Sequence, residues 1–532
     1  MNGMLSMQKI SLYDTTLRDG TQGEEVSFSA EDKVKIARKL DAFGIAYIEG
    51  GWPGSNPKDM EFFERVRNIH FTHAKIAAFG STRRAKNPVE KDTNIRALLD
   101  AQTPVVTIFG KTWLLHVKEA LQITPAENLT IIADSVAYLK KHGKEVIYDA
   151  EHFFDGYKHN SAYALQTLVV AAQAGAETVV MCDTNGGTLP WELSEIIRNV
   201  RKNVTVPLGI HTHNDSETAV ASSLMAVREG CVQIQGTING YGERCGNANL
   251  CSIIPDLQLK MGYRCISDEQ LPHLTTVSRY VSELANLKHA KNLPFVGESA
   301  FAHKGGVHVS AVMKSALTYE HIEPESVGSV RRVLISDLSG RSNVIFKAKE
   351  LGIQLDDGSP AIQKVVDEIK EMEHYGYSYE DAEGSFELMV KRHTGEMKQF
   401  FDLERFQVSI HKDALESEAR SEALIKIRVG NETEITAAEG DGPVNALDRA
   451  LRKALEKFYP ELQQIHLTDY KVRVLDTQNA TAAKVRVLIE TENGESAWNT
   501  VGVSPDVVEA SWKALVDSIS YHLLKHRASG TV

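Results

Sequence analysis

The sequence of 532 residues has only five cysteines, and no two of them form a CxxC pair. An odd and scattered set excludes both a disulfide framework and a cysteine-rich zinc site. We therefore expect reduced thiols and a cytoplasmic location. No apolar run with a cleavage site opens the chain, and no apolar stretch is long enough for a membrane span, so neither a signal peptide nor a membrane partner is expected.

Basic residues are also in short supply. Lys plus Arg total 59 against 71 for Asp plus Glu, which leaves a net charge of −12. Binding to a phosphate backbone needs a basic surface, so this balance argues against nucleic acid as a partner. With 15 prolines, 37 glycines and 42% hydrophobic residues, the composition is that of an ordinary globular protein.

Short β-branched runs alternate with longer amphipathic stretches in the first half of the chain. The eight runs begin near Ile10, Ala46, Ile76, Val105, Val146, Thr178, Leu208 and Val232. Eight such units match the size of an α/β (β/α)₈ TIM barrel, whose strands are buried on both faces. An open doubly wound sheet is the alternative, but no GxGxxG motif follows the first run, where a dinucleotide-binding sheet needs it.

Two helix starts carry specific signals. Ser29 and Asp32 form a capping-box pattern, and Gly44 closes the helix that follows. Thr124 precedes Pro125, which is favoured at the first position of a helix.

The C-terminal part contains a diverged duplication. A β-branched run at 424–429 precedes a helix from Pro443, and a second run at 485–489 precedes a helix from Pro505. This pattern predicts a separate α+β domain built from two strand-strand-helix units. We expect a catalytic barrel over 1–267, a helical accessory region over 268–400 and a regulatory α+β domain over 401–532.

The ends of the predicted barrel strands are unusually polar. Active sites of TIM barrels lie at the C-terminal ends of the strands, and buried charges there need partners or a metal. The polar residues at these ends include Arg18, Asp19, Glu49, Glu151, Thr184, His211, His213 and Asn247.

His211 and His213 are two apart on a strand, so their rings project to the same side. The simpler interpretation is two hydrogen-bonded histidines at a strand end. With Asp19 and Asn247 converging on the same end of the barrel, a metal site is favoured. Mixed imidazole and oxygen ligands suit Mn²⁺, Mg²⁺ or Zn²⁺ with open coordination positions.

Three further residues have two interpretations each. In the functional interpretation, Arg18 stabilises oxyanion charge or holds a substrate carboxylate. In the structural one, it forms an ion pair with Asp19. Glu151 is catalytic or positions a reactant, or it is a structural partner of that arginine. Thr184 binds substrate or makes a loop hydrogen bond.

Four motifs carry a family resemblance. LYDTTLRDGTQ, HTHND, GYGERCGNANL and FAHKGGVHVSA together resemble the metal-dependent acyltransferase and lyase family that contains the 2-isopropylmalate, homocitrate and citramalate synthases. Within this family, YIEGGWPGSNPKD and FAHKGGVHVSA are most similar to the long citramalate synthases. The duplicated C-terminal domain resembles the allosteric domain of the synthases.

The resemblance implies roles for individual residues. The metal ligands would be Asp19, His211, His213 and Asn247. Arg18 would polarise a ketone oxygen, Thr184 would bind the carboxylate of a 2-oxo acid, and Glu151 would hold the ketone end or its arginine. His308 would be the proton-transfer histidine, with Tyr319 as a candidate assistant.

The implied activity is the condensation of acetyl-CoA with pyruvate and water to (R)-citramalate and CoA, an acyltransferase reaction on a pyruvate route to isoleucine. A 2-isopropylmalate synthase acting on 2-oxoisovalerate is the first alternative, and a CoA-independent aldolase is another. A non-catalytic amino-acid sensor is disfavoured because no ligand position is replaced by an apolar residue. Isoleucine is the expected effector, and a homodimer is the expected assembly.

Overall fold

A computed structural model describes residues 8–355, 358–412, 418–475 and 483–529 of the chain. These residues form two compact units. Among them, the first unit comprises the residues up to 301 and residues 322–331, and the second comprises residues 302–321 and the residues from 332 onward. Within the described residues, no helix combines the length and the hydrophobicity needed to span a membrane.

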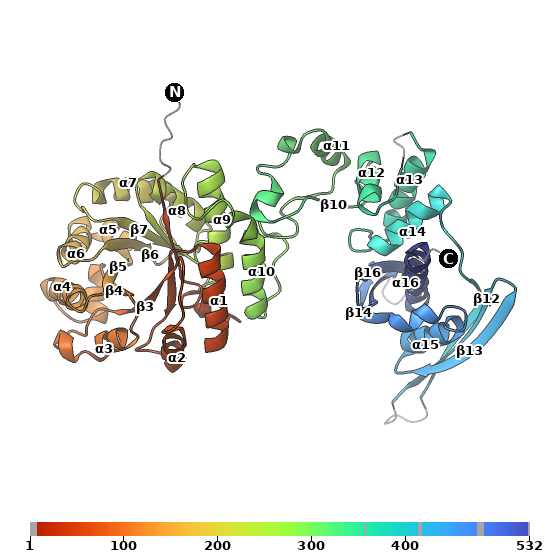
Figure 1. The fold of residues 1–532 in the computed structure, drawn as a ribbon, viewed down its shortest axis with the longest axis horizontal. Helices are drawn as coiled ribbons and strands as arrows, with labels where there is room; N and C mark the ends of the chain where they lie inside the picture. Colours follow the sequence, from red (N-terminus) through yellow and green to blue (C-terminus); the bar gives the residue numbers. More distant parts are fainter. Residues whose placement is uncertain (1–7, 356–357, 413–417, 476–482, 530–532) are drawn as a thin grey trace. The chain divides into compact units, whose positions relative to one another are not determined.

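The first unit is a closed barrel of eight parallel strands, in which β1 pairs with β2 on one side and with β8 on the other. The predicted TIM barrel is therefore confirmed (Figure 1). The strands are β1 Ser11–Asp14, β2 Tyr47–Gly51, β3 Lys75–Ser81, β4 Val105–Lys111, β5 Glu145–Glu151, β6 Thr178–Asp183, β7 Leu208–Thr212 and β8 Gln233–Gly236.

Helices follow the strands and surround the barrel (Figure 1). They are α1 Ala30–Phe43, α2 Pro57–Val66, α3 Thr93–Asp100, α4 Pro125–Lys141, α5 Phe153–His159, α6 Ser161–Gln173, α7 Pro190–Val200, α8 Ala219–Arg228, α9 Leu250–Pro255 and α10 Leu274–Leu284. Both predicted helix starts are confirmed. Ser29 and Asp32 form a reciprocal capping box, Gly44 ends α1 at φ +95°, and Thr124 accepts a hydrogen bond from the backbone of Glu127.

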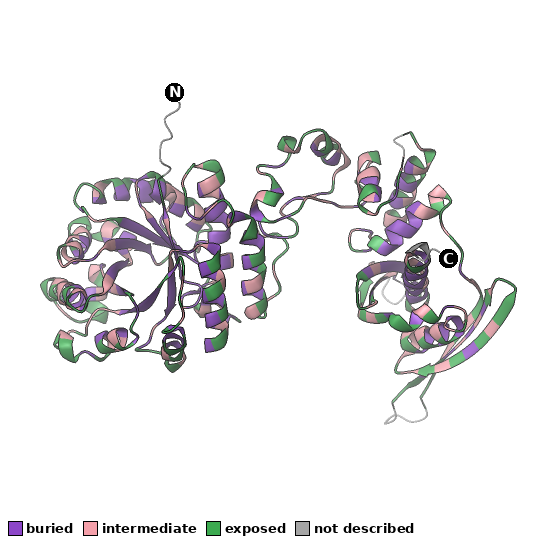
Figure 2. Cartoon of the chain, viewed as in Figure 1, coloured by how far each residue is buried: buried purple, intermediate pink, exposed green. Residues whose placement is uncertain are grey.

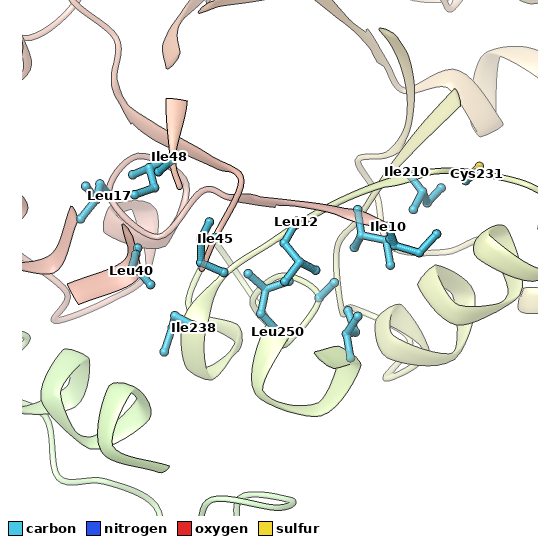
Figure 3. Close-up of a cluster of buried hydrophobic side chains, with 14 of the residues drawn as sticks. Ile10, Leu12, Leu17, Leu40, Ile45, Ile48, Ile210, Cys231, Ile238 and Leu250 are labelled. Atoms are coloured by element: carbon cyan, nitrogen blue, oxygen red, sulfur yellow. The ribbon is translucent and has the colours of Figure 1, made fainter. Parts of the chain in front are cut away.

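Alternate residues of each barrel strand enter two different apolar layers, because successive side chains point to opposite faces. Leu12 of β1 packs outward with Ile45 and Leu250 in the layer between strands and helices (Figure 3). Its neighbour Tyr13 points into the barrel, where it belongs to a small interior cluster with Val180. The strands are largely buried (Figure 2), as the continuous apolar runs indicated.

The second unit combines helices with two three-stranded antiparallel sheets. Its helices are α11 Gly306–Lys314, α12 Arg341–Glu350, α13 Pro360–Tyr375, α14 Glu383–Thr394, α15 Pro443–Leu455 and α16 Val507–Ser529. A two-stranded sheet pairs β9 Ala302–His303 with β10 Arg332–Val333, and the larger sheets contain β11 Asp402–His411, β12 Arg420–Val429, β13 Glu432–Gly440, β14 His466–Val474, β15 Val485–Glu492 and β16 Ala497–Ser504.

The C-terminal duplication is present, but each repeat contains three strands and one helix where the sequence predicted two strands and one helix. The additional strands are β11 and β14, which lie at sheet edges and carry mostly exposed or half-buried residues. A solvated edge strand lacks the apolar alternation that marks a buried one. The boundaries expected near residues 267 and 400 stay predictions.

Candidate active site at the C-terminal end of the barrel

A cavity of about 220 Å³ opens among the C-terminal ends of the barrel strands. One side is polar and carries most of the residues expected from the sequence, while an aromatic wall forms another side. The lining residues are Arg18, Asp19, Gln22, Trp52, Phe79, Phe109, Asp149, Glu151, Cys182, Thr184, His211, His213 and Glu243.

Asp19, His211 and His213 converge within this cavity. Their potential ligand atoms all lie within 4.8 Å of one another, and all three side chains are buried. The two histidine Nε2 atoms are 3.3 Å apart, and Nε2 of His211 lies 3.3 Å from Oδ2 of Asp19. This group could hold a metal ion.

Asn247 completes the arrangement. Its Nδ2 donates to Oδ2 of Asp19 at 2.7 Å, and its backbone pairs with that of His213. The loop that delivers it is tightly built, because Gly246 has φ +87° and a Cβ on Gly242 would lie 2.6 Å from Oδ1 of Asn247. That buried Oδ1 has no hydrogen-bond partner among the described residues, and a flip of the amide exchanges it with Nδ2 and turns it toward Asp19 as an oxygen ligand. The donor set thus fits a divalent cation.

Two of the three side chains are in the protonation states that bind a metal ion. Burial, reinforced by the charge of His211, lowers the pKa of His213 to about 3, so this ring is neutral at physiological pH. Burial opposes ionisation of Asp19, but Arg18 and His211 hold the pKa of that carboxyl well below its usual range. A neutral imidazole and an ionised carboxylate are the forms in which these groups bind metals.

Arg18 is fixed in place by three contacts. Its Nε donates to Oε1 of Glu49 at 2.6 Å, and its Nη1 lies 3.0 Å from Oδ1 of Asp19. The guanidinium carbon lies 3.8 Å from the ring centre of Phe79. The second carboxylate oxygen of Glu49 accepts a hydrogen bond from the hydroxyl of Tyr13 at 2.6 Å. The ion pair of Arg18 with Asp19, one of the two interpretations of the sequence, is therefore present.

Glu151 is not the partner of Arg18 that its structural interpretation expected. It forms an ion pair with Lys111, its register partner on β4, whereas the additional carboxylate that holds Arg18 is Glu49. Thr184 accepts a hydrogen bond from the backbone of His152 at 2.9 Å, as its loop interpretation anticipates, and it also lines the cavity.

His308 belongs to the second unit, on α11. Its ring stacks on that of Tyr319, with the ring centres 4.3 Å apart and an angle of 30° between the planes. Both side chains are exposed. The two residues paired by the resemblance are thus neighbours in the structure.

Several cavity residues were not assigned a role from the sequence. Trp52, Phe79 and Phe109 pack against one another with ring centres 5.5–5.8 Å apart and form the aromatic wall. Gln235 contacts His211 behind the cavity. The sequence from position 232 reads Val-Gln-Ile-Gln, and this alternation is the signal that would have placed Gln235 inside the barrel.

Three protein families match successive parts of the chain. HMGL-like covers residues 9–281, "homocitrate synthase post-HMGL domain-like" covers 295–376, and "LeuA allosteric (dimerisation) domain" covers 380–523. The (R)-citramalate synthase of Geobacter sulfurreducens is 59% identical over 98% of this chain and 98% of its own length.

The chain belongs to the citramalate synthase family. A second member, the (R)-citramalate synthase of Aquifex aeolicus, is 56% identical over 98% of this chain and 99% of the relative. The 2-isopropylmalate synthase of Methanocaldococcus jannaschii is 31% identical over 97% and 95% of the two chains. The resemblance to the citramalate synthases is therefore confirmed. Among solved structures, the hydroxymethylglutaryl-CoA lyase of Pseudomonas aeruginosa matches with a TM-score of 0.45 and 17% identity, over 53% of this chain and 95% of the lyase.

Proposed function

We propose that the chain condenses acetyl-CoA with pyruvate and water to give (R)-citramalate and CoA. The observation that carries this proposal is the meeting of Asp19, His211 and His213 with Arg18 in one cavity that has an aromatic wall. Such a cavity offers a cation site and a fixed positive charge to the oxygens of a 2-oxo acid, and an apolar surface to its alkyl group.

Asp19, His211, His213 and Asn247 would hold Mn²⁺ or Mg²⁺, with Zn²⁺ as a third candidate. A bound divalent cation supplies Lewis acidity at the ketone of the 2-oxo acid. Arg18 adds a guanidinium where alkoxide charge develops, and Glu49 keeps it there without reorganisation during the reaction. Thr184 would bind the carboxylate of the 2-oxo acid, and Glu151, paired with Lys111, would orient the ketone end.

His308 would take the proton from the methyl group of acetyl-CoA, because a neutral imidazole is a competent base near neutral pH. The methyl carbon then forms the new bond to the ketone carbon, whose oxygen takes up a proton. Water cleaves the thioester of the product and CoA leaves as the thiol. No covalent link to the chain is needed.

The aromatic wall is our argument for pyruvate over bulkier 2-oxo acids. Trp52 is anchored by a hydrogen bond from its Nε1 to Asn94, at 2.7 Å, and the two phenylalanines stack on each other. A rigid wall of three rings leaves room for a small alkyl group and resists one that is branched.

The test is a parallel assay of free CoA released from acetyl-CoA with pyruvate, 2-oxobutyrate, 2-oxoisovalerate and 2-oxoglutarate. We expect the highest kcat/KM with pyruvate, and (R)-citramalate as the product. Preference for 2-oxoisovalerate would make the chain a 2-isopropylmalate synthase. Carbon–carbon cleavage of a hydroxy acid without CoA, and no CoA release with any of the four acids, would make it an aldolase.

We further propose that the chain is a cytoplasmic homodimer inhibited by isoleucine. The "LeuA allosteric (dimerisation) domain" match supports an effector and a dimer, and the five free cysteines suit a reducing compartment. The full chain should be titrated with isoleucine, leucine and valine while its mass is followed by light scattering. Inhibition by isoleucine alone, through a coupling of about 1–3 kcal/mol, supports the proposal. Stronger inhibition by leucine or a monomeric mass contradicts it.

A further inference from the structure

Gln235 lies directly beside His211 in the barrel wall. The two residues are register partners on β8 and β7, and both point into the interior. Gln235 is completely buried and His211 is 6% exposed. A buried amide in a barrel interior must satisfy its polar atoms, so its contacts indicate what it does.

The amide oxygen of Gln235 lies 2.8 Å from Nδ1 of His211. Its amide nitrogen donates to Oδ1 of Asp149 at 2.9 Å. Because a carboxylate accepts hydrogen bonds, the nitrogen of the amide faces Asp149 and the oxygen faces the histidine. Nδ1 of His211 must then carry a proton, so in the neutral ring the lone pair lies on Nε2, the atom that faces Asp19 and His213.

His211 and His213 differ in the hydrogen bonding of Nδ1. Nδ1 of His213 is buried and has no hydrogen-bond partner in the part of the chain that the structure describes. Only His211 is held through its second nitrogen. An apolar side chain at position 235 could fill the same volume but could fix neither the tautomer nor the ring orientation of His211.

We propose that Gln235 is a positioning residue that holds His211 in the tautomer and orientation needed to bind the cation, with Asp149 fixing the amide. This proposal rests on the proposed metal site. Partners of the second nitrogen of a metal-ligating histidine commonly contribute about 10–100-fold to metal affinity.

The experiment measures the dissociation constant of Mn²⁺ by electron paramagnetic resonance on the full chain without substrate. It is run at about pH 8, above the pKa of Asp149, which burial and the nearby Glu49 raise to about 7. Gln235→Leu should weaken Mn²⁺ binding by about 10–100-fold. The double variant Gln235→Glu with Asp149→Asn keeps an acceptor for Nδ1 of His211 and a hydrogen bond between positions 235 and 149, so it should keep an affinity close to that of the wild type.

Gln233→Leu is the matched control, because Gln233 is a buried glutamine two positions earlier on the same strand and the same face. It should leave Mn²⁺ binding unchanged. Should Gln235→Leu fail to fold, Gln235→Asn, which is too short to reach both partners, should show the same loss.

The outcomes separate the two proposals. A wild-type chain that binds no Mn²⁺ overturns the metal site itself and this inference with it. A wild-type chain that binds Mn²⁺ while Gln235→Leu binds equally well overturns only the role of Gln235. An equal loss in Gln235→Leu and in the double variant also overturns that role, because the acceptor beside Nδ1 of His211 would then make no difference to Mn²⁺ binding.

Discussion

Glu49 and Arg18 are joined by a 2.6 Å hydrogen bond from the arginine Nε, and the glutamate is completely buried. The carboxylate also accepts from the hydroxyl of Tyr13, so both of its oxygens are engaged. A charge in this setting is tolerated only because it is paired. We infer that Glu49 fixes the guanidinium at the position where it meets the reacting ketone.

Glu49→Gln should therefore lower kcat by roughly 10–100-fold, which corresponds to the loss of one charge-assisted hydrogen bond of about 1.5–3 kcal/mol. Steady-state kinetics with acetyl-CoA and pyruvate measure the effect. Glu145→Gln is the matched control, since Glu145 accepts from Tyr47 and pairs with Lys75 at the opposite end of the barrel. Equal kinetics in Glu49→Gln and the wild type would remove Glu49 from the mechanism.

His213→Ala should abolish turnover and bound metal while the fold persists. The ligands lie at strand ends that the barrel already orders, so the cation is not expected to organise the core. Metal analysis, circular dichroism and CoA release measure the three properties. Chelation of the wild type should give the same loss, and full activity with a demonstrably metal-free chain would rule out the metal site.

The barrel and its helix starts could be predicted from the sequence because their signals are local. Continuous β-branched runs mark strands buried on both faces, and Ser29 with Asp32 forms a cap within a few residues. The sequence also predicted that Asp19 and the two histidines lie close together, because the C-terminal ends of parallel strands meet at one end of a barrel.

Contacts that depend on register could not be predicted in this way. Lys111 with Glu151, and His211 with Gln235, are neighbours only because β4 aligns with β5 and β7 with β8 at those residues. The edge strand β11 was missed for a different reason. Its side chains are largely solvated, so packing and not local pattern decides its conformation.

Phe109→Ala should broaden the substrate range. Removing one ring from the aromatic wall opens space beside the ketone site, so kcat/KM for 2-oxobutyrate relative to pyruvate should rise by about tenfold or more. Parallel CoA-release assays give the ratio. Phe71→Ala, at a half-buried position outside this cavity, is the control. An unchanged ratio in Phe109→Ala would show that the wall does not set selectivity.

His308→Asn should leave binding of the 2-oxo acid nearly intact and lower turnover by roughly 10²–10⁴-fold, the usual range for a lost general base. Tyr319→Phe keeps the stacked ring and removes only the hydroxyl, so its effect should be smaller. Exchange of the methyl protons of acetyl-CoA with solvent deuterium is the direct readout. Exchange and turnover that both persist in His308→Asn would assign the base to another residue.

Asp517 should make the stability of the second unit depend on pH. Ser385 of α14 donates to this carboxyl of α16 at 2.6 Å, and burial raises its pKa from 3.8 to about 6. The folded chain therefore holds the proton more tightly than the unfolded chain does. The resulting stabilisation is complete below pH 3.8 and is lost as the pH rises through about 6.

Asp517→Asn cannot ionise and still offers Ser385 an acceptor, so it should be more stable than the wild type at about pH 8. The difference in the free energy of unfolding between the variant and the wild type should shrink by about 1 kcal/mol on acidification to about pH 5, because the wild-type carboxyl then regains its proton. Thermal melting of both chains across this range measures the difference. Asp367→Asn, an exposed aspartate on α13, controls for the loss of one negative charge. A difference between Asp517→Asn and the wild type that stays constant with pH would show that the carboxyl titrates alike in the folded and unfolded chains.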